Sequence, residues 1–242
     1  MISNRKQRIE KSFGSKAHSY HQHANLQRDI AKKLVYSLPE ETPSKILEIG
    51  CGTGFVTELL LHKYPQSQIH VTDISQDMLQ YTQQRFIGYK NLTFSIQDGE
   101  NLNLNDQYDL IISSMAIQWF EYPNVTLNDY KNILTQKGSI YFSTLGSDNF
   151  QEWRECLNDL KLSNGLLDTH PYDGIFKEEK TILSYNSGLD FLKSFKKIGA
   201  HQSHDNHAPL KQFDLKKACA LLEDKYNSSV TWHIQYGHIL ND

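Results

Sequence analysis

Residues 45–54 read Lys-Ile-Leu-Glu-Ile-Gly-Cys-Gly-Thr-Gly, and this stretch decides the fold of the chain. Its short apolar run ends in three glycines that alternate with single residues: Gly50, Gly52 and Gly54. An amphipathic segment follows at once, with apolar residues at helical spacing: Phe55, Val56, Leu59 and Leu60. A buried strand, a tight glycine loop and a helix form the opening unit of a doubly wound α/β sheet. Glycines let such a loop approach a ligand closely, and the free N–H groups at the helix N-terminus favour an anionic group.

The spacing of the glycines separates two kinds of cofactor loop. A dinucleotide fingerprint reads G-x-G-x-x-G, whereas here Phe55 stands where the third dinucleotide glycine belongs. Glu48 lies two positions before the first glycine, so the stretch reads E-x-G-x-G-x-G. This pattern resembles motif I of the class I S-adenosylmethionine (AdoMet) methyltransferases, in which the loop packs against the methionine part of the cofactor. An ordinary glycine-rich turn between strand and helix is the alternative.

Polar residues stand at the ends of the next three expected strands. These strands are expected at 68–72, 92–96 and 108–113, and the polar residues are Asp73, Asp98 and Ser113. The carboxyl ends of parallel strands meet at one edge of an open α/β sheet, where such sheets bind ligands. We expect Asp73 to accept hydrogen bonds from both hydroxyls of a ribose, with helix capping as the alternative. The resemblance implies that Asp98 faces the adenine amino group.

The expected cofactor is AdoMet, which leaves as S-adenosylhomocysteine. Its predicted contacts come from an N-terminal helix and the ends of four strands: Gln27, Glu48, Gly50, Cys51, Gly52, Gly54, Asp73, Ile74, Met78, Asp98, Gly99 and Ser113. No metal is expected, because the three cysteines are far apart and form no C-x-x-C pair.

Length and composition limit the possible classes of protein. A chain of 242 residues, 38% of them hydrophobic, can build one α/β domain with an embellishment. The formal net charge of −3 does not indicate a nucleic-acid partner. No apolar run approaches the ~20 residues of a membrane helix, and no signal peptide is visible at the N-terminus. The scattered cysteines favour a reducing cytoplasm.

We expect a single α/β domain with a Rossmann-like, doubly wound sheet and helical lid elements. Its parts are an N-terminal helical lid (1–38), an AdoMet-binding core (45–145), substrate and lid insertions (146–228) and a last strand (229–239). Helices are expected at 4–13, 17–38, 55–64, 76–86, 124–134, 149–161, 187–198 and 214–226, and further strands at 139–144 and 181–185. The lid segments lie outside the alternating β/α pattern, so we expect them to cover the reacting methyl group.

Several stretches across the chain resemble the malonyl–acyl-carrier-protein O-methyltransferases of biotin synthesis. The most specific are Ser12-Phe13-Gly14 with Ser19-Tyr20 and residues 23–28, then Ala116-Ile117-Gln118-Trp119 and Lys197-Ile198-Gly199-Ala200. Leu47 to Gly54, Phe142-Ser143-Thr144-Leu145 and Trp232-His233 also match. The resemblance implies methylation of the free carboxylate of a malonyl thioester on acyl carrier protein. In one departure, this chain has Tyr172-Asp173-Gly174-Ile175-Phe176 where many members carry an Arg before the Phe, so another cation would have to serve the carboxylate.

For the substrate we expect three positioning residues and no general base, because a carboxylate is already ionised at neutral pH. The positioning residues are Tyr20, Gln118 and Trp119, and Arg154 is the candidate cation, with a surface or packing role as its alternative. Two other functions stay open: AdoMet-dependent methylation of another small molecule, and a non-catalytic AdoMet- or nucleotide-binding protein. Turnover on malonyl-carrier protein but not on small acids separates the first two, and cofactor binding without turnover supports the third.

Two groups of basic residues could dock an acidic carrier protein. Residues 1–36 hold eight Lys/Arg against two acidic residues, a net charge of +6 that leaves −9 on the remainder. The N-terminal group is Arg5, Lys6, Arg8, Lys11 and Lys16, and the later group is Lys193, Lys196 and Lys197. We favour the later group, because a helix presents its charges at fixed spacing, whereas residues 4–13 form either a short helix or a mobile arm.

Overall fold

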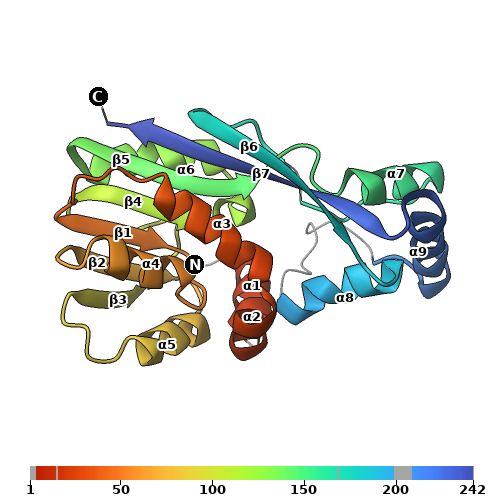
Figure 1. Ribbon diagram of the computed structural model, residues 1–242, viewed down its shortest axis with the longest axis horizontal. Helices are drawn as coiled ribbons and strands as arrows, with labels where there is room; N and C mark the ends of the chain where they lie inside the picture. Colours follow the sequence, from red (N-terminus) through yellow and green to blue (C-terminus); the bar gives the residue numbers. More distant parts are fainter. Residues whose placement is uncertain (1–3, 15, 168, 199–208, 242) are drawn as a thin grey trace.

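The computed structural model describes residues 4–14, 16–167, 169–198 and 209–241. Its centre is a seven-stranded sheet in the order β3-β2-β1-β4-β5-β7-β6 (Figure 1). The parallel strands are β1 (Lys45–Ile49), β2 (Gln68–Asp73), β3 (Leu92–Ile96), β4 (Tyr108–Ser114) and β5 (Leu134–Leu145). Strand β7 (Ser229–Leu240) runs antiparallel to both β5 and β6 (Ile175–Ser184). The predicted doubly wound α/β fold is confirmed.

Helices cover both faces of the parallel strands, because successive residues of a strand point to opposite sides. Ile46 and Leu110 pack in the core beneath α3 (Asn25–Tyr36) and α4 (Phe55–Lys63). Leu47 and Ile111 pack in a second core with α6 (Pro123–Asp129) and the 3-10 helix η2 (Tyr130–Ile133). Helix α5 (Gln76–Arg85) contacts β2 and β3. Strands buried on both faces need near-continuous apolar sequence, which β1 and β4 have.

Strands β6 and β7 extend past the parallel core and carry a further group of helices (Figure 1). Helices α7 (Gln151–Asp159), α8 (Gly188–Ile198) and α9 (Gln212–Tyr226) pack on one another there. Phe150 anchors this group, because its ring lies 4.7 to 5.5 Å from the rings of Phe191, Phe195 and Trp232. Helices α1 (Asn4–Gly14) and α2 (Ala17–His23) contact α5, and α2 also contacts α8. The N-terminal helices therefore bridge the core and the outer helices.

Two expected helices have different bounds in the structure. The expected helix 17–38 is broken at Ala24 (φ −88°, ψ 48°), which separates α2 from α3. No capping side chain marks this break, so the periodic apolar pattern ran straight through it. The expected helix 124–134 ends as α6 and η2, and β5 begins at Leu134 instead of residue 139. The first part of β5 is irregular, with a register shift opposite Tyr108 and a left-handed backbone at Lys137 (φ 69°). Its sequence there therefore does not show the regular pattern of a strand.

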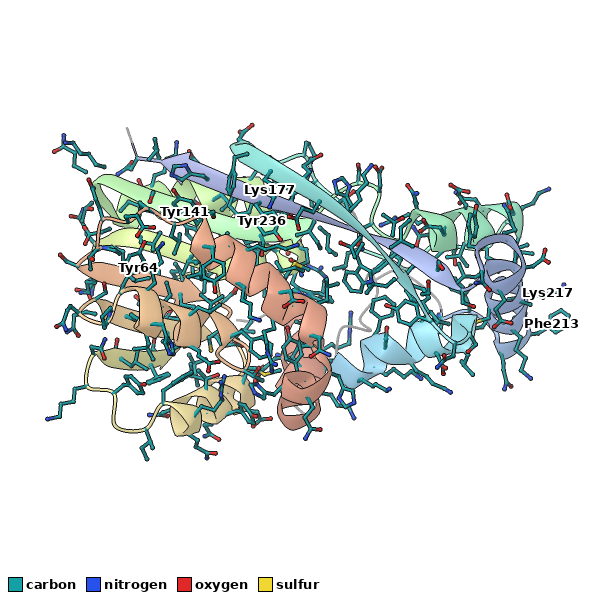
Figure 2. The ribbon with its side chains drawn as sticks, in the orientation of Figure 1. Tyr64, Tyr141, Lys177, Phe213, Lys217 and Tyr236 are labelled. Atoms are coloured by element: carbon teal, nitrogen blue, oxygen red, sulfur yellow. The ribbon has the colours of Figure 1, made fainter. Side chains whose placement is uncertain are left out.

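The edge strand β6 is longer than the expected 181–185. It begins at Ile175 and carries exposed charged residues, a common way of protecting a sheet edge, so its pattern is that of a polar loop. Lys177 Nζ lies 5.6 Å from the ring centre of Tyr236 on the neighbouring strand, and both are labelled in Figure 2. All three cysteines are free and buried. Within the described residues, no helix is long and apolar enough to cross a membrane.

Gly237 gives a test of this packing. A Cβ at Gly237 would lie 2.1 to 2.7 Å from ring atoms of Phe142, which is fully buried and cannot move aside. We expect Gly237→Ala to lower the free energy of unfolding by about 1–3 kcal/mol, the usual cost of overpacking, as measured by urea denaturation. Thr181→Ala on the exposed edge strand is the control and should change stability by less than about 0.5 kcal/mol. Equal stabilities of the two variants would contradict the packing of β7 on β5.

Candidate active site

An inner pocket lies at the carboxyl edge of the parallel strands. The loop after β1 and the ends of β2 and β3 form one side of it, and residues of α1, α2 and α3 form the other. Nine of the twelve predicted cofactor residues line it: Gln27, Gly50, Cys51, Gly52, Asp73, Ile74, Met78, Asp98 and Gly99. Residues far apart in the sequence are thus brought together where the topology of the sheet predicts a ligand.

The Asp73 carboxylate ties two loops of the inner pocket together. Its Oδ2 accepts a hydrogen bond from Gly52 N at 2.9 Å, and its Oδ1 accepts one from Ser75 N at 2.8 Å. Burial raises the pKa of Asp73 to about 6, and the hydrogen bonds from Ser75 and Gly52 oppose that rise. Ser75 itself caps α5, because its Oγ accepts from Met78 N. Ile74 N–H also interacts with this carboxylate, so only part of its acceptor capacity of roughly four sites remains for a ligand.

Three predicted cofactor residues lie behind the pocket wall. Glu48 is 2% exposed, its Oε2 accepts a hydrogen bond from Thr57 Oγ1, and burial raises its pKa to about 7. Gly54 starts α4 in a left-handed conformation (φ 81°). Ser113 donates a hydrogen bond to Ile49 O at 3.0 Å. None of these three residues lines the inner pocket, where direct contact with the cofactor was expected. The hydrogen bonds of Glu48 and Ser113 instead hold the strand and helix on either side of the glycine loop, which does line the pocket.

Asp98 is bound by Lys6 from helix α1. Lys6 Nζ lies 2.8 and 2.6 Å from the two Asp98 carboxylate oxygens and 2.8 Å from Glu100 Oε2. Burial alone would raise the pKa of Asp98, but the hydrogen bonds from Lys6 and Asn101 hold it below its ordinary value. Lys6 therefore belongs to the pocket, and α1 is a packed helix whose Ile9 is 6% exposed. Lys6, one member of the expected N-terminal docking group, is thus bound to Asp98 and Glu100 at the pocket.

A larger outer pocket, of about 450 Å³, adjoins the inner one. The two share five residues, here called the neck: Phe13, Tyr20, Gln27, Met115 and Trp119. The remaining wall is mainly apolar and comes largely from residues 145–172, helix α8 and residues 209–215. Both segments predicted as lids, 1–38 and 146–228, therefore contribute to the pockets. Lys193 and Lys196 of α8 also line the outer pocket, and Lys197 follows them on the helix.

Gln118 and Arg154, predicted to contact the substrate, are engaged with the protein. Gln118 lies in the 3-10 helix η1 (Ile117–Trp119), and its Nε2 donates to Met115 O at 2.8 Å. Arg154 donates from Nε to Asn149 O and from Nη2 to Leu167 O, each at 3.1 Å. Arg154 lines the outer pocket but not the neck. A contact between Arg154 and the reacting carboxylate therefore does not match the geometry.

Two neck residues were not predicted from the sequence. Phe13 packs edge-on against Trp119, with ring centres 5.2 Å apart, and Met115 lies in the turn between β4 and η1. Phe13 belongs to one of the stretches that resemble the methyltransferase family, and Met115 directly precedes another. Their place beside these stretches was the signal that could have found them.

The residues of the inner pocket suit AdoMet. The carboxylates of Glu10, Asp73 and Asp98 line it together with Lys6, which is paired with Asp98, and the remaining excess of negative charge favours a ligand with sulfonium and ammonium charges. Gly52 has a left-handed backbone (φ 53°), which favours glycine, and its Cα faces the Tyr20 ring: a Cβ there would lie 4.0 Å from Tyr20 Cε1. Aromatic rings such as Tyr20 also attract cations. The remaining acceptor capacity of Asp73 suits a ribose hydroxyl.

Comparison with known proteins agrees with this geometry. A family model described as a methyltransferase domain matches residues 47–140. The YcgJ protein of Bacillus subtilis has a similar structure, with a TM-score of 0.62 and 14% identity over 88% of this chain and 97% of that one. The N-methyltransferase NodS of Bradyrhizobium japonicum, solved with S-adenosyl-L-homocysteine, gives a TM-score of 0.53 and 14% identity over 96% and 98% of the two chains. Fold and site define a class I AdoMet-dependent methyltransferase.

Sequence relatives define the family more closely. The chain is 31% identical to malonyl-[acyl-carrier protein] O-methyltransferase of Magnetococcus marinus, over 97% of this chain and 92% of the relative. It is 32% identical to malonyl-[acyl-carrier protein] O-methyltransferase 2 of Ilyobacter polytropus, over 93% and 90%. It is also 32% identical to the biotin biosynthesis bifunctional protein BioCD of Bordetella avium, over 95% of this chain and 51% of that protein. The chain belongs to the malonyl-[acyl-carrier protein] O-methyltransferase family.

The role of Asp73 can be tested through cofactor affinity. Asp73→Asn removes a charged acceptor and should weaken AdoMet binding by about 1–3 kcal/mol in calorimetry at pH 8. Because burial raises the pKa of Asp73 to about 6, the wild-type affinity should fall as the pH drops through that value. The variant should lack this dependence. Asp77→Asn makes the same charge change at an exposed position nearby and should bind like wild type. Equal affinities of all three proteins would rule out a ribose contact by Asp73.

Proposed function

We propose that this enzyme transfers the methyl group of AdoMet to the free carboxylate of a malonyl thioester on acyl carrier protein, giving the malonyl methyl ester in biotin synthesis. The names of the relatives support this acceptor. The composition of the neck supports the chemistry. Tyr20 is the only titratable neck residue, and burial raises its pKa above the ordinary value, so it is no base at neutral pH. An acceptor there must already be a nucleophile, as a carboxylate with a pKa of about 4 is.

The lack of a base among the neck residues separates a carboxylate acceptor from other acceptors. An amine or alcohol must lose a proton during methylation, and a positioned base usually assists that loss. The neck provides no such group among its five residues. A methyltransferase that acts on the amine or alcohol group of a small molecule is therefore the weaker alternative.

The neck residues position the carboxylate and exclude water. Bound AdoMet supplies an electrophilic methyl group on a positively charged sulfur. The Tyr20 hydroxyl, the Gln27 amide and the Trp119 indole N–H are neutral donors that can orient a carboxylate, and the Phe13 ring packs against Trp119. Because the carboxylate loses its charge in the reaction, neutral donors favour the ground state less than an arginine would. Positioning of this kind can supply roughly 7–11 kcal/mol of the barrier reduction.

The outer pocket supports an acceptor carried on a protein. A free acid could react with only the neck occupied, whereas a carrier-bound thioester needs a channel for the arm that links it to its protein. The outer pocket extends from the neck to α8, where Lys193 and Lys196 line it. Carrier proteins of fatty-acid synthesis are generally acidic, so lysines at this end suit their docking.

The state of the cysteines bears on the compartment. All three cysteines are free and buried, which suits a reducing environment. We therefore propose that the reaction takes place in the cytoplasm.

The acceptor is tested by mass spectrometry. Malonyl-carrier protein incubated with enzyme and AdoMet should gain one methyl group, while free malonate under the same conditions should remain largely unmethylated. Methylation of free malonate at an equal or higher rate would contradict a carrier-bound acceptor.

The docking surface is tested by charge reversal on α8. Rim charges mainly change association rates, so Lys196→Glu with Lys197→Glu should raise KM for malonyl-carrier protein and flatten its salt dependence. Turnover of a small malonyl thioester too short to reach α8 should stay nearly unchanged. The control is Lys216→Glu with Lys217→Glu on α9, which makes the same charge change; Lys217 lies over Phe213 at the far end of the molecule (Figure 2). Equal losses on both acceptors, or equal effects of both double variants, would remove the docking role of α8.

A further inference from the structure

Met115 has a strained backbone at the neck. Its φ of 56° lies in the left-handed region, which is unfavourable for a residue with a Cβ atom. Among the described residues, five other non-glycine residues have a positive φ: Lys137, Phe150, Lys161, Asn227 and Ser228. Of these, Phe150 lines the outer pocket but not the inner one, and the other four line neither of these two pockets. Met115 is therefore the strained residue that faces both pockets, and such strain is often found where function requires it.

Hydrogen bonds hold both backbone polar groups of Met115. Its N–H donates to Ser143 O on β5 at 3.0 Å. Its carbonyl oxygen accepts from Gln118 Nε2 at 2.8 Å. The neighbouring Ser114 Oγ also lies 3.0 Å from Ser143 Oγ. The turn is thus fixed on two sides, so the backbone of Met115 is held and its side chain starts from a fixed point at the neck.

The same turn packs directly on the cofactor loop. A Cβ added to Gly50 would lie 2.5 Å from Ala116 Cβ, so Ala116 rests against the backbone of Gly50. Gly50 has a left-handed backbone as well (φ 70°). Two small residues therefore set the distance between the cofactor loop and the Met115 turn.

The outer pocket is too large to measure the length of a short acyl group. With a volume of about 450 Å³, it has room well beyond the reacting end of a malonyl thioester. Discrimination against one extra methylene requires a close fit around the substrate, and it is then worth about 10–200-fold. The neck is where such a fit can arise, since its five residues line both pockets.

We propose that Met115 sets the length of the acceptor: its side chain, carried at the neck by a turn with a fixed backbone, excludes dicarboxylyl thioesters one methylene longer than malonyl. This inference rests on the proposed function. Gln118 is then a positioning residue that acts through the carbonyl of Met115. This role explains why the Gln118 side-chain amide donates its hydrogen bond to the main chain.

The test compares malonyl- and succinyl-carrier protein as acceptors for the same enzyme. Met115→Ala should raise the succinyl-to-malonyl ratio of kcat/KM about tenfold or more, and Met115→Leu should keep the wild-type ratio because it restores the volume. Gln118→Ala should shift the ratio in the same direction as Met115→Ala. Leu192→Ala, a similar truncation that lines only the outer pocket, should leave the ratio unchanged.

Thermal melting tests the strained turn independently of activity. Glycine adopts a left-handed backbone without penalty, so Met115→Gly should melt at the same temperature as Met115→Ala or higher. A lower melting temperature for the glycine variant would overturn the strain at this position. An unchanged acceptor ratio in an active Met115→Ala enzyme would overturn the length selection alone. A wild-type enzyme that methylates neither carrier protein would overturn the proposed function as well.

Discussion

The contact between Gly50 and Ala116 fixes where methyl donor and acceptor can meet. Strands β1 and β4 are neighbours in the sheet, with Ile49 paired to Ser113, so the loops that follow them leave the same edge side by side. Only a residue without a side chain allows the second loop to pack on the first, because a Cβ at Gly50 would meet Ala116 at 2.5 Å. The inner pocket and the neck are built around this contact. A change in either residue would alter the distance over which the methyl group must move.

The charges of the two pockets suit a reaction in which charge disappears. The inner pocket presents the carboxylates of Glu10 and Asp73 to a cationic cofactor, with Asp98 paired to Lys6, whereas the neck offers aromatic rings and neutral donors. A sulfonium and a carboxylate become a thioether and an ester, so both charges are lost in the transfer. A site of low polarity stabilises separated charges less than water does, and it therefore favours such a step. The five neck residues have no charged side chain, which is consistent with this requirement.

The sequence predicted the parallel core and most of the cofactor pocket, because both follow from local patterns. Strand ends and glycine spacing place Gly50, Asp73 and Asp98 at one edge whatever the rest of the chain does. The neck could not be predicted in the same way, since it joins α1, α2, α3 and the turn after β4, whose contacts depend on tertiary packing. The break at Ala24, the ion pair of Lys6 with Asp98 and the use of Gln118 on Met115 O have no local signal. The charge of Arg154 makes it a candidate in the sequence, but only the three-dimensional structure shows that it lines the outer pocket and not the inner one.

The site of methylation tests the central claim most directly, because malonyl thioesters have both a free carboxylate and an acidic α-carbon. The enzyme should be supplied with malonyl-carrier protein and AdoMet labelled with carbon-13 in its methyl group, and the product followed by NMR. A carboxylate acceptor predicts a methoxy signal whose protons correlate with the carboxyl carbon of the malonyl group. A labelled methyl group on the α-carbon, or none on the carrier protein, would contradict it.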